Sequence, residues 1–179
     1  MKKNLLTVSA LALAVMSGSA MAAVNGGDIQ FLGTVTDTTC DIVAESNGAV
    51  SNVIQLGNVK VKATGTDHEG SVIDFALKPK AGATCTFTGL TNATFAFTGN
   101  LDANGLTNQG GSATGAYAKL KSVNANTPGD ITSTANTAEV AVTNLANATS
   151  DGAKFSAQLI GDTTPGDYRS AVAYVVSYQ

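Results

Sequence analysis

The alternation of apolar and polar residues in short runs is the feature that most restricts what this chain can fold into. Neighbouring side chains of an extended strand point to opposite faces, so a period of two is typical of strands with one buried face. The runs are also rich in Val, Phe and Thr, which favour strands. They are Ile29–Phe31, Val53–Leu56, Lys60–Lys62, Val72–Leu77, Cys85–Phe87, Thr94–Phe97 and Phe155–Leu159. The pattern predicts an all-β fold.

Turn-forming residues separate these runs. The turn signals are Asn47–Gly48, Gly65–Asp67, Gly82, Gly99–Asn100, Pro128–Asp130 and Pro165–Asp167. Many short strands with such punctuation favour a β-sandwich with Greek-key connections. A closed barrel stays open as an alternative, because alternation alone does not distinguish a barrel from two packed sheets.

Two further segments carry specific expectations. Leu101–Gly115 is polar, Gly-rich and irregular, which predicts an exposed loop. Ala138–Val142 and Asn144–Leu145 keep the alternation within a stretch rich in Thr, Ala and Asn, so we expect them to pair into a sheet.

The first residues have the layout of a secretory signal. Lys2 and Lys3 precede the apolar stretch Leu5–Val15, and small residues lead up to Ala22. The apolar stretch is too short to span a bilayer stably. The alternative is a retained amphipathic anchor or a buried helix, but the segment lacks a polar stripe. We therefore expect residues 1–22 to be removed and the chain to be exported.

Export would place Cys40 and Cys85 in an oxidising compartment, where paired thiols normally form a disulfide. The sequence holds two cysteines, so one intramolecular bond is the only connectivity within the chain. Closing a loop of this length stabilises a fold by about 4 kcal/mol on the chain-entropy model. Neither residue lies in a Cys-x-x-Cys pair, so a structural role is favoured over a redox role.

Composition argues against several classes of function. The chain has 10 Lys and Arg against 13 Asp and Glu, a net charge of −3, and no cluster of basic residues, which disfavours nucleic acid as a partner. One His and two Cys leave little material for a metal centre, and we expect no cofactor. Asp102–Gly105 is similar to the opening of a calcium loop but lacks the remaining ligands.

Catalysis is also not predicted. No Gly-x-Ser-x-Gly nucleophile turn occurs, and any Ser-His-acid triad would have to recruit the lone His68. His68 lies among Gly, Thr, Asp and Glu residues that are typical of a solvated turn. The chain is therefore expected not to be an enzyme.

Both ends of the expected exported chain have strand character. Near the N-terminus, the residues that share one face of an extended segment are Ile29, Phe31, Gly33 and Val35. At the C-terminus, the residues that share one face are Tyr168, Ser170, Val172, Tyr174, Val176 and Tyr178. The two ends have the pattern of strands that need partners.

These features together resemble the structural pilins of the chaperone-usher pathway, as in the major subunits of type 1-like fimbriae. The residues that carry the resemblance are the block VNGGDIQFLGTV ahead of Cys40, a second cysteine at Cys85, the penultimate Tyr178, and Gly166 ahead of the alternating C-terminal segment. The resemblance covers the chain from residue 23 to its end.

The resemblance implies an immunoglobulin-like sandwich that lacks its final strand. In that family a periplasmic chaperone lends a strand to the exposed groove, and the N-terminal extension of the next subunit then replaces it at an outer-membrane usher. It also implies a division into a signal peptide (1–22), a donor-strand extension (23–36) and a pilin domain (37–179), in a surface fimbria built from copies of the chain.

Residue roles follow from the same resemblance. Cys40 and Cys85 match the family's disulfide, and Gly166 and Tyr178 match its chaperone-recognised C-terminal motif. Ile29, Phe31, Gly33 and Val35 would enter a neighbouring subunit. The residues that would line the acceptor groove are Gly166, Tyr168, Val172, Tyr174, Val176 and Tyr178.

Other functions remain as alternatives. The chain would be an adhesive or minor pilus subunit if Leu101–Gly115 or the turn at His68 bound host glycans. It would be a monomeric periplasmic immunoglobulin-like binding module if residues 23–179 folded alone. A secreted hydrolase is the third alternative, with the least support from the residues.

Overall fold

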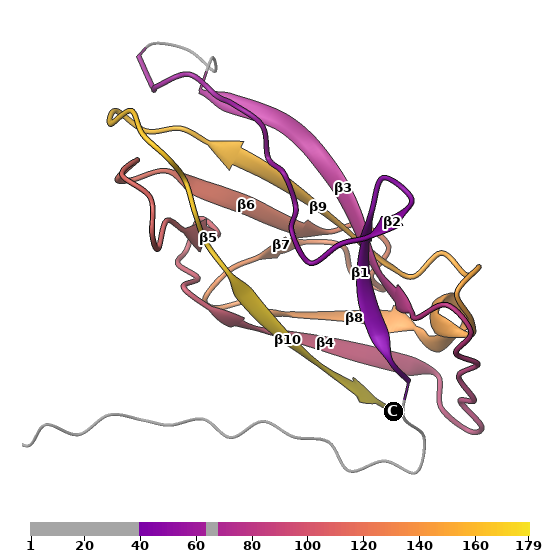
Figure 1. Cartoon of the computed structure of the whole chain (residues 1–179). Helices are drawn as coiled ribbons and strands as arrows, with labels where there is room; N and C mark the ends of the chain where they lie inside the picture. The colour runs from indigo at the N-terminus through magenta and orange to yellow at the C-terminus, as the bar shows by residue number, and fades with distance from the viewer. Residues whose placement is uncertain (1–39, 64–67) are drawn as a thin grey trace, which may run out of the picture. The chain divides into compact units, whose positions relative to one another are not determined.

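The computed structural model describes residues 40–63 and 68–179, and these form an all-β sandwich of two antiparallel sheets (Figure 1). Several expectations lie outside the described residues. They are cleavage after Ala22, the extension 23–36 with Ile29, Phe31, Gly33 and Val35, and the turn Gly65–Asp67.

The larger sheet has the strand order β2-β1-β3-β9-β6-β5, and β7 also pairs with β6. The bounds of its strands are β1 Ile42–Ser46, β2 Ala49–Val50, β3 Glu69–Pro79, β5 Leu106–Thr107, β6 Tyr117–Ser122, β7 Asp130–Ile131 and β9 Ala153–Ile160. The long strands β3, β9 and β6 lie side by side, so they supply most of the inner surface of this sheet.

The smaller sheet has the order β10-β4-β8. Its strands are β4 Asn92–Gly99, β8 Thr137–Ala141 and β10 Val172–Tyr178, and a short 3₁₀ helix, η1 Val142–Leu145, follows β8. β4 is the central strand, with β8 and β10 on its two sides.

The core lies between the two sheets, where the predicted alternation is seen as alternating burial. In β4 the side chains of Ala93, Phe95 and Phe97 are buried. From the other sheet, the Phe155 ring lies edge-on to Phe97 with ring centroids 5.2 Å apart, and 6.0 Å from the ring of Phe95. These contacts confirm the sandwich over the barrel, because they join inner faces of two separate sheets.

Several of the predicted strands are present. Val72–Leu77 lies in β3, Thr94–Phe97 in β4 and Phe155–Leu159 in β9, and β8 contains Ala138–Ala141. The tight turn at Asn47–Gly48 is also confirmed. Both of its residues have positive φ, +53° and +77°, as a two-residue hairpin turn requires.

Four predicted strand segments were wrong. Val53–Leu56 and Lys60–Lys62 belong to no strand. The segment that contains both runs makes backbone hydrogen bonds to the rest of the fold near its two ends: Ser51 N donates to Ala44 O, and Lys62 N donates to Asp162 O. Alternation without a ladder partner does not make a sheet strand.

The other two errors lie near the disulfide. The run Cys85–Phe87 adds no strand; the chain makes only a single bridge there, between Thr84 and Asn147. Asn144 and Leu145 lie in the helix η1, which turns the chain away after β8 and buries Leu145.

The segment Leu101–Gly115 is less exposed and more regular than the loop that the sequence predicts. It contains β5, which pairs with β6, and Leu101 forms a bridge to Leu106. Gly105 and Ala113 are buried. Within the described part of the chain, no helix has the length and apolar character needed to cross a membrane.

Candidate functional site

The last strand, β10, has one unpaired edge. On one side it is antiparallel to β4, with a continuous register from Val172 opposite Gly99 to Tyr178 opposite Ala93. On its other side, no strand of residues 40–63 and 68–179 pairs with it (Figure 1). An open sheet edge of this kind presents main-chain groups to a further strand.

The register identifies which main-chain groups face the open edge. The backbones of Gln179 and Asn92 exchange two hydrogen bonds of 2.9 Å, which makes them a hydrogen-bonded pair. Such pairs alternate along an antiparallel ladder. The N–H and C=O groups that point away from β4 are therefore those of Val172, Tyr174, Val176 and Tyr178.

The side chains of the same four residues point toward the core and are only half-buried. The ring centroids of Tyr174 and Phe95 lie 6.4 Å apart, and those of Tyr178 and Phe87 lie 5.1 Å apart. Burial raises the pKa of both phenols, and the neighbouring Tyr174 raises that of Tyr178 further. Each of the four residues thus combines an inward apolar side chain with main-chain groups on the open edge.

A groove of about 980 Å³ continues from the start of β10. Residues 52–61 form one wall and residues 164–172 form the other. Its floor comes from the inner side of the larger sheet and the loops beside it, including Phe75, Leu106, Ala113, Ala116, Ala118, Leu120, Ala157 and Leu159. The small floor residues leave room for a side chain larger than their own.

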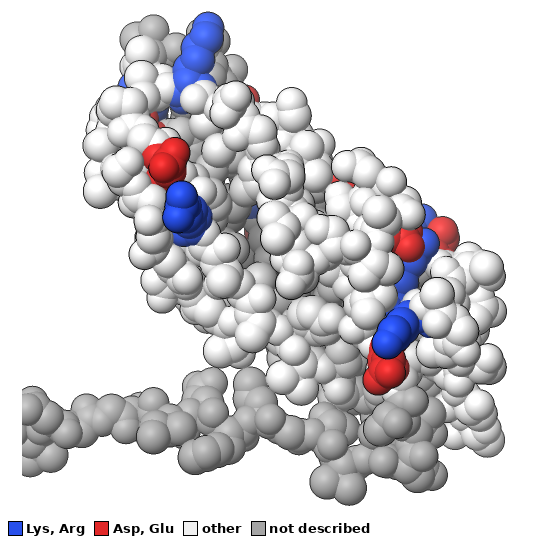
Figure 2. Space-filling model, in the orientation of Figure 1, with Lys and Arg blue, Asp and Glu red and all other residues white. Residues whose placement is uncertain are grey.

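The face that carries this groove is largely uncharged. In Figure 2 the central part of the face shows neither acidic nor basic side chains, and the charged groups lie toward its two ends. The charged residues that line the groove are Lys60, Asp162, Asp167 and Arg169. An open strand edge that continues into an apolar groove suits an extended, mainly uncharged peptide segment.

Two predicted groove residues lie before the strand, because β10 begins only at Val172. Tyr168 donates a hydrogen bond of 2.8 Å from its hydroxyl to Leu106 O, and burial raises its pKa. Gly166 has φ +155° and lies against Ser112 and Ala113, so a side chain there would meet backbone. Both residues line the groove wall and not the strand.

Comparison with known proteins identifies the family. The chain is 38% identical to the F107 fimbrial protein of Escherichia coli, over 178 residues that cover 99% of each chain. It belongs to the fimbrial proteins. The K99 fimbrial protein of Escherichia coli is 34% identical over 116 residues, 65% of this chain and 60% of that protein. No protein-family model matches the chain. As a fimbrial protein it is exported to the cell surface.

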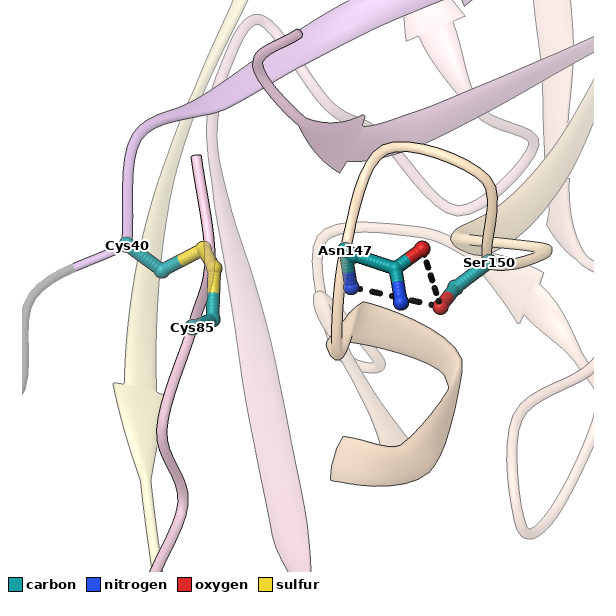
Figure 3. Close-up of a disulfide and its surroundings, with 4 residues drawn as sticks. All are labelled: Cys40, Cys85, Asn147 and Ser150. Carbon is teal, nitrogen blue, oxygen red and sulfur yellow. Dashed lines mark hydrogen bonds between the residues drawn. A yellow bond between two sulfur atoms is a disulfide. The ribbon is translucent and has the colours of Figure 1, made fainter. Parts of the chain in front are cut away.

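The disulfide of this fimbrial protein is present as predicted. Cys40 and Cys85 are joined, with Cα atoms 5.5 Å apart (Figure 3). Cys85 N donates to Ala146 O at 3.2 Å, and the adjoining loop is closed by a 3.3 Å hydrogen bond from Asn147 N to Ser150 Oγ. The disulfide therefore joins the chain just before β1 to the segment around Cys85, which lies beside the loop that begins at Ala146.

A second, polar cleft of about 590 Å³ adjoins the groove, with which it shares the lining residues Ala116, Gly161 and Asp162. It brings together His68 and the loop Leu101–Gly115, which are far apart in sequence. The Nδ1 atom of His68 is buried without a hydrogen-bond partner among the described residues. In residues 40–63 and 68–179 no group of three or more His, Cys, Asp or Glu side chains is placed to hold a metal ion.

Sequence reasoning missed two parts of the groove. The sequence predicts strands at Val53–Leu56 and Lys60–Lys62 where the structure has the wall 52–61, and its pattern does not single out the floor alanines. A signal for the floor exists in the alternation of Ala116 and Ala118 with larger residues, but nothing local shows that these alanines face a groove and not a closed core. The donor residues Ile29, Phe31, Gly33 and Val35 lie outside the described residues.

Proposed function

We propose that this protein is a structural subunit of a surface fimbria that polymerises by donor-strand exchange. The N-terminal extension of one copy, residues 23–36, adds a strand beside β10 of the next copy and fills its groove. The observation that carries the proposal is the open edge of β10, which is continued at Val172 by an apolar groove.

The donor segment matches the edge in chemistry and in length. Ile29, Phe31 and Val35 alternate as the groove requires, and their burial is worth roughly 5–9 kcal/mol before ordering costs. Each added main-chain hydrogen bond contributes about 0.5–1.5 kcal/mol. The segment 29–35 has as many residues as β10, whose length is 7 residues. Gly33 has no side chain and so allows close approach to the groove floor.

The geometry of such an interface is head to tail. The donor lies at the start of the chain and the acceptor at its end, so the contact joins two different surfaces of identical molecules. An interface of this heterologous kind builds an open filament when its rotation does not close. The fimbrial names of the relatives agree with an assembled filament.

Before assembly, a periplasmic chaperone would occupy the same open edge, and an outer-membrane usher would then exchange it for the donor segment. Tyr178, which packs on Phe87, and Gly166, which shapes the groove wall, are the residues we assign to chaperone recognition. Tyr178→Ala should lower the periplasmic level of the subunit. Gln179→Ala is the matched control, because Gln179 pairs with Asn92 through its backbone; equal levels for both variants would contradict the assignment.

The test of polymerisation replaces inward donor residues. Phe31→Ala and Gly33→Asn should leave the chaperone complex intact but reduce filaments seen by electron microscopy, and also reduce detergent-resistant polymer on unheated gels. Gln30→Ala is the control, because residue 30 has the opposite parity and faces outward. Normal filaments in both inward variants would refute the donor role. A chain 23–179 that stays monomeric and folded without a chaperone would favour the monomeric binding module.

Adhesion to host surfaces is a second candidate function, and the polar cleft favours it. Its lining includes amide, hydroxyl and ring side chains, among them Gln109 and Tyr117, which are groups that bind sugar hydroxyls and ring faces. Purified filaments should then bind glycans on an array, and a Tyr117→Ala filament should bind less. Filaments that assemble normally and bind no glycan would remove this second function and leave the first intact.

A further inference from the structure

Residues 165–171 of the groove wall, here called the rim segment, are hydrogen-bonded to the loop 101–115. The rim segment precedes β10 and lies outside any strand. The loop 101–115 binds it through many hydrogen bonds, although the two are about 60 residues apart in sequence, as in the separation of 61 between Arg169 and Asn108. The position of the rim segment therefore depends on this loop.

The side-chain amide of Asn108 is the centre of the contact. Its Nδ2 donates to the carbonyl oxygens of Gly111 at 2.9 Å, Ala113 at 2.9 Å and Asp167 at 3.3 Å. Its Oδ1 accepts from the backbone N–H groups of Gly111 and Arg169, both at 3.0 Å. One amide thus fixes the shape of the loop and also binds the rim segment at two residues.

Backbone contacts extend the same attachment. Gln109 N donates to Arg169 O at 2.7 Å, and Ala113 N donates to Asp167 O at 3.0 Å. At Gly111 a Cβ atom would collide with Asp167 O, so the loop and the rim segment approach each other backbone to backbone. Such close packing needs the loop conformation that Asn108 holds.

The attachment joins Asp167 and Arg169 of the rim segment to the loop 101–115. With the rim segment bound in this way, the groove between it and the wall 52–61 is open over the apolar floor. A groove that is already open spares the incoming strand the cost of displacing its own wall, and pre-organisation of this kind speeds and strengthens binding.

We propose that Asn108 is a positioning residue for strand uptake: it anchors the rim segment to the loop 101–115 and thereby keeps the entrance of the groove open. The inference rests on the proposed donor-strand function. The residue type matters. Aspartate would oppose a carboxylate to three carbonyl oxygens, and alanine would leave those oxygens and two N–H groups without this partner.

The test uses the full-length subunit purified as its complex with the periplasmic chaperone. The probe is a synthetic peptide with the sequence of residues 23–36, and the rate at which it replaces the chaperone is followed by native mass spectrometry. Asn108→Ala should slow this exchange about tenfold, the effect of one to two lost hydrogen bonds. The control is Asn104→Ala in the same loop, whose amide contacts Asp102 alone among the described residues, at 3.5 Å; its rate should stay within about twofold of wild type.

A second measurement separates positioning from general stability. Hydrogen exchange of the β8 amides should be unchanged in Asn108→Ala, because β8 lies on the far side of β4 from β10 and does not line the groove. Asn108→Asp has nearly the same shape and keeps an oxygen that accepts from both N–H groups. It should also slow the replacement of the chaperone by the peptide, and it takes the place of the alanine variant if that variant does not accumulate. Wild-type rates of chaperone replacement in either variant, or slower replacement together with a loss of hydrogen-exchange protection in β8, would overturn the inference. A wild-type complex that takes up no peptide would instead refute the donor-strand function itself.

Discussion

The hydroxyl of Tyr174 donates a 3.0 Å hydrogen bond to the carbonyl oxygen of Ile42, across 132 positions of the sequence. Ile42 begins β1, which belongs to the larger sheet, and Tyr174 lies in β10 of the smaller one. The bond therefore links the two sheets at the free edge, beyond the end of the groove that residues 52–61 and 164–172 enclose. The side chain of the third residue of β10 is thus bound to β1, while the strand edge itself has no strand partner among the described residues.

Replacing Tyr174 by Phe removes this link and keeps the ring that packs near Phe95. We expect the free energy of unfolding to fall by about 0.5–1.5 kcal/mol, because Ile42 O loses a partner at a half-buried site. Urea unfolding of the folded subunit measures the change. An unfolding midpoint equal to that of wild type would show that the bond adds nothing to stability.

Alkaline pH should lower the free energy of unfolding through the tyrosines of β10. Burial raises the pKa of Tyr174 and Tyr178 above the ordinary value of 10.0. The folded chain then holds these protons more tightly than the unfolded chain does, so the contribution of the two phenols to stability is constant below about pH 10 and is lost as pH rises through the folded pKa. Unfolding midpoints measured from pH 8 upward should show this fall, and it should be smaller in Tyr174→Phe. A profile that does not change in that variant would contradict the assignment.

Phe155 is a central contact between the two sheets: its ring packs against Phe95 and Phe97 of the smaller sheet and against Phe75 of its own sheet. Phe155→Ala should cost about 3–5 kcal/mol, because it removes a buried ring and leaves a cavity. Val72→Ala is the control: Val72 lies in the same sheet but is 58% exposed, so its loss should change stability by about 0.5 kcal/mol or less. Similar losses in both variants would mean that this inter-sheet contact is not the centre of the core.

Breaking the disulfide should destabilise the subunit by about 2–5 kcal/mol and lower the amount of folded protein in the periplasm. Cys40→Ser leaves a free thiol at Cys85, so the double variant Cys40→Ser/Cys85→Ser is the better measure of the bond itself. Periplasmic yield and urea unfolding together report the effect. Full yield and an unchanged midpoint in the double variant would show that the bond is dispensable for folding.

The parts of the fold that could be predicted are those in which burial alone determines the structure. β3, β4 and β9 follow the alternation because each presents one face to the core, as the buried Phe95 and Phe155 show. Val53–Leu56 has the same alternation and forms no strand, because a strand also needs a hydrogen-bonding neighbour. Local sequence does not show whether that neighbour exists.

The same distinction applies to the site. The alternation at the C-terminus was enough to select Val172, Tyr174, Val176 and Tyr178, since one parity determines both the inward side chains and the outward backbone groups. The start of the strand was missed, because Tyr168 and Ser170 bond to Leu106 and Thr107 far away in the sequence. Asn108 could not be found for the same reason: its partners Asp167 and Arg169 come near it only in the folded chain.

The disulfide has a mechanical consequence. Tension on the chain ahead of Cys40 reaches Cys85 through the sulfur bridge, so it cannot extend the intervening loop, which includes β1 and β3. A separation of 45 positions corresponds to about 150 Å of extended chain that a pulling force cannot draw out while the bridge is intact. A filament made of such subunits would yield by other routes before it lengthened by unravelling this part of each one.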